Sequence, residues 1–144
     1  MSTMIDSLPQ DFRPQGNTEI HEFESSIAWF EDSIFFIHSL PNVDHTIEHA
    51  IAQTQFFEKH YFSTTKCPMI CDVRTCRPIK KPVRDYYSSP EGTTMVSQFA
   101  FLIESPFSKV VANFFITIKN SPIEIKMFNS TTESIAWCKL ESKK

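Results

Sequence analysis

A cluster of basic side chains is the first place where this sequence could do chemistry. Five of the fourteen Lys and Arg residues fall within eleven positions, although the chain has a net charge of −3. Together with one hydroxyl, the cluster consists of Arg74, Thr75, Arg77, Lys80, Lys81 and Arg84. Arginine presents a fork of N–H donors that matches a carboxylate or a phosphate. We therefore expect residues 74–84, called the basic loop below, to bind an anion or an acidic partner.

The same charges also have a purely structural explanation. Asp72, Asp85 and Glu91 lie close by in the sequence and can neutralise the basic side chains as surface ion pairs. If the loop binds a partner, replacing Arg74 and Arg77 weakens that binding. If the charges pair internally, the same replacements lower the stability of the fold.

A second constellation is His45-Thr46-Ile47-Glu48-His49, which has the H-x-x-E-H pattern of inverzincin zinc proteases. Two histidines four residues apart on one helix face can hold Zn²⁺, and a nearby glutamate can activate its water. Such a site needs a third ligand, and Glu124 falls on a predicted strand. We expect the motif to be the polar first turn of a helix, so a zinc hydrolase on His45 and His49 is the least favoured alternative.

The four cysteines, Cys67, Cys71, Cys76 and Cys138, contain no C-x-x-C pair. This spacing predicts neither a zinc ribbon nor a disulfide framework, and we expect free thiols, two or three of them buried. Cys76 lies among cations, which would favour its thiolate. No histidine is near it in sequence, so a catalytic cysteine is not favoured.

Composition excludes several other classes of protein. The only glycines are Gly16 and Gly92, too few for a Walker A loop or a G-x-G-x-x-G turn. The negative net charge argues against general attraction to nucleic acid or to a membrane surface. There is no apolar run of about 18 residues and no signal-peptide pattern, so we expect a cytoplasmic protein without a cofactor.

The elements that must position these residues are predicted from hydrophobic periodicity and from capping residues. Residues 1–18 have no apolar period and are expected to form a flexible tail, followed by a single domain over 19–144. Strands are predicted at 27–30, 34–37, 68–73, 95–103 and 124–128, with a turn at Glu31-Asp32-Ser33. Helices are predicted from His45 after an Asp44 N-cap, around Pro82, over 105–119, and from a capping box at 130–133 through Leu140.

The helix over 105–119 carries an apolar stripe: Phe107, Val110, Val111, Phe114, Phe115 and Ile118. Such spacing is typical of a helix packed on a core, and a pocket for an apolar ligand is the alternative. The complete order is β-β-α-β-α-β-α-β-α, which predicts an α/β fold with a mixed central sheet and packed helices.

This order is that of the STAS fold of anti-sigma-factor antagonists, and individual segments extend the resemblance. Those segments are Asp72-Val73-Arg74, Val83 to Tyr87, Phe99 to Ile103, Ser105-Pro106, Asn113 to Phe115, Met127-Phe128 and Ala136-Trp137. From about Glu19 to Leu140 the chain resembles a STAS-like, single-domain family of unassigned function that is common in Bacteroidota. The resemblance implies a STAS-like fold and, by analogy, a regulatory or interaction role.

One family motif is missing. In phosphorylated STAS proteins the loop after the third strand carries Asp-Ser or Asp-Thr followed by glycine, whereas here Asp72-Val73 continues as Arg74-Thr75-Cys76. Thr75 is the only hydroxyl in that loop, and it does not follow an aspartate. We therefore expect a non-catalytic domain that acts through contact with a protein partner, with a homodimer as one form. The alternative is a module that binds a small anionic or apolar ligand through residues 74–84.

Overall fold

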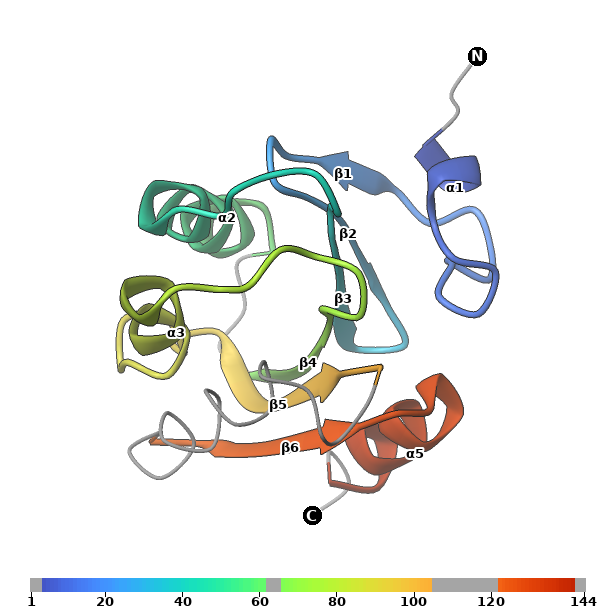
Figure 1. The fold of residues 1–144 in the computed structure, drawn as a ribbon. Coiled ribbons are helices and arrows are strands. Elements are labelled where there is room, and N and C mark those ends of the chain that lie inside the picture. Colours follow the sequence, from blue (N-terminus) through green and yellow to red (C-terminus); the bar gives the residue numbers. More distant parts are fainter. Residues whose placement is uncertain (1–3, 62–65, 105–121, 142–144) are drawn as a thin grey trace.

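The computed structural model describes residues 4–61, 66–104 and 122–141, whose course is shown in Figure 1. Its elements are α1 (Met4–Ser7), β1 (Ile20–Glu22), β2 (Ser26–Glu31), β3 (Ile34–Ser39), α2 (Ile47–His60), β4 (Cys67–Asp72), α3 (Lys81–Tyr87), β5 (Val96–Leu102), β6 (Glu124–Phe128) and α5 (Thr131–Glu141). The predicted α/β class and the order of the described elements are confirmed, and α1 and β1 are additional. The predicted helix over 105–119, with its apolar stripe, lies outside the described residues.

The six strands form one mixed sheet in the order β1-β2-β3-β4-β5-β6. β1, β2 and β3 pair antiparallel, and β3 to β6 pair parallel. The β2–β3 hairpin turns at Asp32 and Ser33, whose φ angles of 54° and 60° are those of a left-handed two-residue turn. The predicted turn is therefore in the predicted place.

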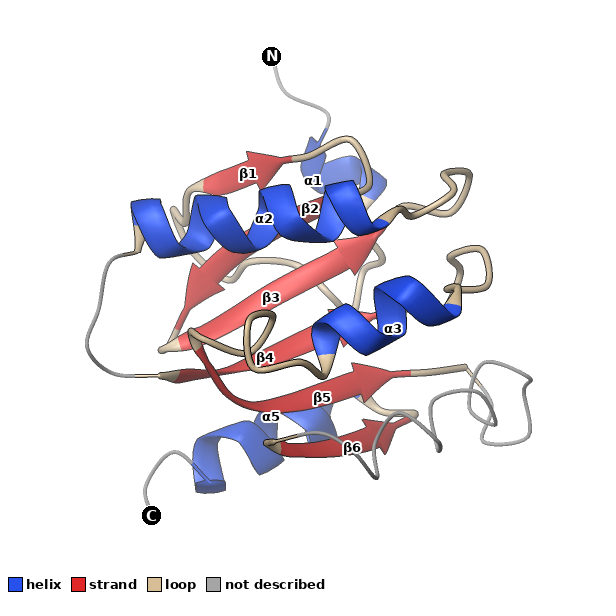
Figure 2. Cartoon of the chain, turned by 90° about the vertical axis from the view of Figure 1, so that its left-hand side faces the viewer, coloured by secondary structure: helices blue, strands red, loops and turns tan. Residues whose placement is uncertain are grey.

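Helices cover both faces of the sheet. α2 and α3 lie on one face, and α1 and α5 lie on the other, as Figures 1 and 2 both show. Neighbouring residues of the central strand β4 serve different faces: Met69 and Cys71 belong to the core under α2 and α3, and Ile70 belongs to the core under α5. β4 is therefore buried on both faces of the sheet. Among the described residues, no helix is both long and apolar enough to cross a membrane.

The prediction of a flexible tail over residues 1–18 is wrong for the part that the structure places. Leu8 and Phe12 are 3% and 1% exposed and belong to the core on the α5 face. The ring of Phe12 lies 5.2 Å from that of Trp29 and 5.7 Å from that of Phe36, centroid to centroid. Two isolated apolar residues produce no period in the sequence, yet they cover this aromatic pair. The segment is part of the domain.

The helix α2 begins two residues later than predicted. Its N-cap is Thr46, whose hydroxyl accepts a hydrogen bond from the His49 amide, while Nδ1 of His49 accepts one from the Thr46 amide. This reciprocal capping box satisfies two amide donors and leaves Asp44 outside the helix. At the start of α5, Ser130 Oγ accepts a hydrogen bond from the Glu133 amide, as the predicted capping pattern requires.

Candidate functional site

The basic loop leaves the sheet at Asp72, the last residue of β4, whose side chain is 1% exposed. One carboxylate oxygen accepts hydrogen bonds from the backbone N–H and Nε–H of Arg74, at 3.1 and 2.9 Å. The other accepts from Nδ1 of His38 at 2.9 Å and from Nη2 of Arg74 at 3.2 Å. A carboxylate only accepts, so Nδ1 of His38 carries the proton. These four bonds fix the first turn of the loop.

Burial and hydrogen bonding act on Asp72 in opposite directions. Burial alone raises the pKa of its carboxyl group, but the hydrogen bonds from His38 and Arg74 outweigh burial, and the pKa is lowered from its ordinary value of 3.8. Asp72 is therefore a buried carboxylate with its acceptors occupied. It acts as the anchor of the loop and has no open side for a substrate.

Each nitrogen of the Arg74 guanidinium also donates a hydrogen bond. Its Nη1 and Nη2 donate to the two carboxylate oxygens of Asp11 at 2.8 and 2.9 Å, in addition to the bonds that it makes with Asp72. Asp11 accepts a further bond from the hydroxyl of Thr131 at 3.3 Å. Hydrogen bonding to Asp11 raises the pKa of Arg74 above its ordinary value. Arg74 thus joins the end of β4 to the N-terminal segment and to α5.

Arg84, at the far end of the basic loop, bonds to a different part of the chain from Arg74. Arg84 lies in α3 and donates from Nη1 to the backbone oxygen of Ile79 at 2.5 Å. Ile79 is itself 6% exposed and packs in the core under α2 and α3. Arg84 and Ile79 therefore hold the second half of the loop against the domain, as Asp72 and Arg74 hold the first half.

Between these two anchors the loop presents exposed side chains: Thr75, Arg77, Lys80 and Lys81. Nη1 of Arg77 lies 3.0 Å from Oδ1 of Asp44, and Nζ of Lys81 lies 2.7 Å from Oδ2 of Asp85. Both are pairs of exposed side chains, which contribute little to stability and exchange readily with other partners. Of the six predicted residues, the four exposed ones thus remain available to contact an acidic surface. The other two, Arg74 and Arg84, make hydrogen bonds within the domain.

The predicted thiolate of Cys76 is not supported. Burial raises the pKa of Cys76 to about 11, and the negative charge of Asp72 adds to this effect. Its Sγ lies 3.5 Å from the backbone oxygen of Val73. Burial also raises the pKa of Cys138 to about 12. None of the four cysteines, all of them among the described residues, is in a disulfide, and these protonated thiols are poor nucleophiles near neutral pH.

The two histidines of the H-x-x-E-H motif have separate roles. His45 precedes α2, and its Nε2 lies 3.3 Å from the backbone oxygen of Leu40. His49 completes the capping box and reaches Oε2 of Glu24 at 3.2 Å with its other nitrogen. Since they do not share a helix face, this arrangement gives the zinc-hydrolase alternative no support.

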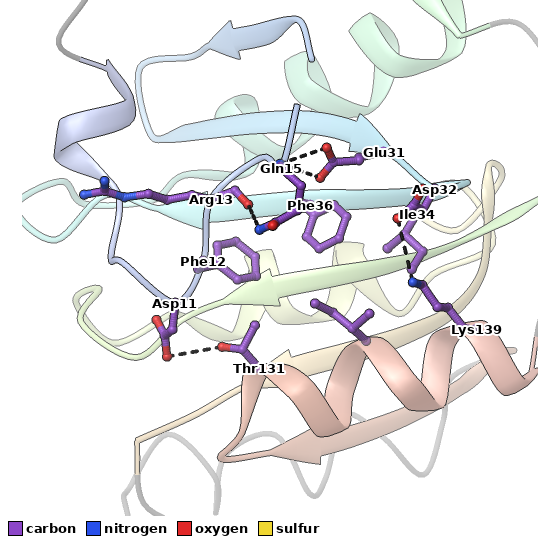
Figure 3. A pocket seen from close by; sticks show the side chains of 11 residues that line it. Asp11, Phe12, Arg13, Gln15, Glu31, Asp32, Ile34, Phe36, Thr131 and Lys139 are labelled. Atoms are coloured by element: carbon purple, nitrogen blue, oxygen red, sulfur yellow. Dashed lines mark hydrogen bonds and ion pairs between the residues drawn. The ribbon is translucent and has the colours of Figure 1, made fainter. Parts of the chain in front are cut away.

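The structure also contains a cavity that the sequence does not predict. A space of about 130 Å³ lies between the N-terminal segment, the β2–β3 turn and α5, and Figure 3 shows its lining. Phe12, Ile34 and Phe36 give it an apolar side, while the carboxylate of Glu31 accepts hydrogen bonds from the Gln15 amide at 2.9 and 3.1 Å. The cavity is well below the size of ordinary ligand pockets. No sequence signal could indicate it, because one wall is the segment expected to be free.

Among the described residues, three side chains that could hold a metal ion lie together: Glu19, His21 and His60. They lie at the end of α2 that is remote from Asp44 and the basic loop.

Comparison with known proteins identifies the family. No curated protein matches the chain. A similar solved structure is that of an uncharacterized protein from the DUF3478 family with a SpoIIAA-like fold, from Shewanella loihica PV-4. The two chains are 15% identical over 84% of this chain and 91% of the other, with a TM-score of 0.49. A family model described as a domain of unknown function, DUF7793, matches residues 28–141. Because this match spans more than half of the chain, the protein belongs to the DUF7793 family.

Proposed function

We propose that this protein is a non-catalytic interaction domain that binds an acidic region of a protein partner through the basic loop. The contact residues are those that the loop exposes: Thr75, Arg77, Lys80 and Lys81. The observation that carries the proposal is the double anchoring of the loop. Asp72 holds its first turn from the buried end of β4, and Arg84 holds Ile79 at its far end.

An anchored loop is suited to binding because its conformation is set in advance. Ordering a free loop costs conformational entropy when a partner arrives, and a loop that is already ordered avoids this cost. Its cations also stand out in a chain whose net charge is −3. A local positive patch steers an acidic partner toward the correct orientation and raises the association rate.

The small-ligand alternative has less support from the geometry. A small phosphate or carboxylate ligand is best held by convergent arginine forks. The guanidinium of Arg74 already donates hydrogen bonds to Asp11 and Asp72, and that of Arg84 donates to the backbone oxygen of Ile79. The exposed cations that remain suit a broad acidic surface better than a compact anion.

The biological role that goes with this proposal is a regulatory contact in the cytoplasm, in line with the resemblance to anti-sigma-factor antagonists. The partner is either a different protein or a second copy of the chain. Sedimentation of the purified protein distinguishes the two, because self-association through the loop is weakened by raised salt and by loss of Arg77 and Lys80.

The proposal is tested by capture of partners from native lysate on three immobilised forms of the protein. These are the unmodified chain, Arg77→Ala with Lys80→Ala, and a control that removes two cations elsewhere, Lys126→Ala with Lys139→Ala. We expect a partner that the unmodified chain and the control retain and that the loop variant loses by at least about tenfold, as expected for two lost charge contacts. Equal capture by all three forms, with unchanged thermal stability, would contradict the proposal.

A further inference from the structure

A cluster of metal-ligating side chains lies where the edge strand β1 meets the end of α2. Glu19 directly precedes β1, His21 is the middle residue of that strand, and His60 is the last residue of α2. One ligand atom from each lies within 4.8 Å of the other two. Nε2 of His60 and Oε1 of Glu19 are 3.5 Å apart. Two ligands on one tetrahedral Zn²⁺ are separated by about 3.3 Å, so this pair already has nearly the required spacing.

Aromatic packing holds both imidazole rings in place. The ring of His60 stacks on Phe56, with centroids 5.0 Å apart and planes inclined by 13°. The ring of His21 packs against Phe56 at 4.7 Å and against His60 at 4.8 Å. The hydroxyl of Tyr61 lies 2.6 Å from Nε2 of His21. Such supporting contacts orient histidine ligands and raise the affinity of a metal site.

The donor set has a definite chemical preference. Two imidazoles and one carboxylate are ligands for Zn²⁺ and related transition metals, whereas Mg²⁺ and Ca²⁺ require mainly oxygen donors. Access is open as well, because the side chains of His60 and Glu19 are 39% and 68% exposed.

We propose that Glu19, His21 and His60 form a Zn²⁺ site that clamps the edge strand β1 to the end of α2. Three protein ligands leave a fourth position for water. The site is independent of the basic loop: α2 has 14 residues and is roughly 20 Å long, and Arg77 pairs with Asp44 beyond its other end. A bound ion would stabilise the native state, because the unfolded chain does not bring these three residues together.

The test is a calorimetric titration of the full chain with Zn²⁺ after removal of metal with a chelator. We expect one Zn²⁺ per chain and a melting temperature that rises with Zn²⁺ concentration. Glu19→Gln and His60→Gln should each weaken Zn²⁺ binding by at least about tenfold. Both replace exposed side chains, so the variants should fold, which circular dichroism checks. His21 is buried and is left unchanged for this reason.

Matched controls are Glu22→Gln on the same strand and His49→Gln in the capping box, and both should bind Zn²⁺ as the unmodified chain does. Co²⁺ gives a second readout, because tetrahedral coordination produces strong visible absorption that Glu19→Gln and His60→Gln should abolish. The proposal is overturned if the unmodified chain binds no Zn²⁺ at micromolar concentration. It is equally overturned if Glu19→Gln and His60→Gln bind Zn²⁺ as tightly as the unmodified chain, which would place the ion on the thiols or at His49.

Discussion

The conformation of the basic loop depends on the carboxylate of Asp72. A charge whose side chain is 1% exposed is costly unless it is fully paired, and here His38 and Arg74 supply the pairing. Removing one member of such a group leaves the others buried without a partner. The loop and the stability of the fold are therefore linked at this residue.

Asp72→Asn should lower the free energy of unfolding at pH 7 by about 3 kcal/mol, because it breaks a buried ion pair while preserving volume. The pKa of Asp72 is lowered in the folded state, so its stabilising effect is present above the ordinary value of 3.8 and is lost as the pH falls through the lower folded value. The free energies of unfolding of the unmodified chain and of Asp72→Asn, both measured in urea, should therefore differ less below about pH 4 than at pH 7. Asp85→Asn, which alters an exposed pair, should change stability by less than about 1 kcal/mol. A difference for Asp72→Asn that is constant from pH 7 to pH 3 would show that Asp72 is not the anchor.

Gly92 is a second residue with a specific structural requirement. A Cβ at this position would overlap the backbone oxygen of Tyr86, at the end of α3. Gly92→Ala should therefore destabilise the protein by about 1–3 kcal/mol through forced backbone movement. The other glycine provides the control, because a Cβ on Gly16 has nothing within 4 Å. Thermal unfolding of both variants checks this prediction, and equal melting temperatures would refute it.

Among the elements, the N-terminal segment packs against the sheet as part of the domain. Phe12 closes one side of the sheet and contacts both Trp29 and Phe36, while Asp11 holds Arg74. The segment therefore supports the basic loop from the face opposite α2 and α3.

Phe12→Ala should cost about 3–5 kcal/mol, the usual loss for a fully buried phenylalanine. For a chain of this length this corresponds to a fall in melting temperature of roughly 6 °C or more. Gln10→Ala, at an exposed position of the same segment, should leave the melting temperature unchanged. If Phe12→Ala also leaves it unchanged, the segment does not pack on the sheet in solution.

The β2–β3 hairpin and the cap of α5 were predictable because their signals are local. The β2–β3 hairpin shows as two apolar runs around Asp32 and Ser33, and the start of α5 shows as Ser130 followed by Glu133. The role of Arg74 was predictable only as one of two alternatives. Its charge indicates either a binding residue or a member of an ion pair. The structure shows the ion pair, because Arg74 bonds to Asp11, which lies 63 residues away in the sequence.

Other features carry no local signal. Leu8 and Phe12 become core residues only because a sheet face with Trp29 lies beneath them. Glu19 and His60 meet through the packing of α2 beside β1, so no spacing in the sequence predicts their meeting. Conversely, His45 and His49 have the spacing of a metal site, but Thr46 caps the helix between them and separates them.

In the molecule as a whole, the basic loop and the cluster of Glu19, His21 and His60 lie at opposite ends of α2. The basic loop lies near its start and offers a positive surface on a negatively charged protein, and the cluster around His21 lies near its end. Loss of one site should leave the other intact. A protein with Glu19→Gln should therefore retain its partner, and one with Arg77→Ala should retain Zn²⁺.

The proposed function requires a partner to contact the exposed part of the basic loop. Hydrogen exchange of the complex with a captured partner tests it most directly, because it maps the contact without any substitution. We predict slowed exchange of the amides in residues 75–81 and a loss of this protection as salt is raised. Protection confined to α5 and the N-terminal segment, with the amides of residues 75–81 exchanging as in the free protein, would contradict the claim.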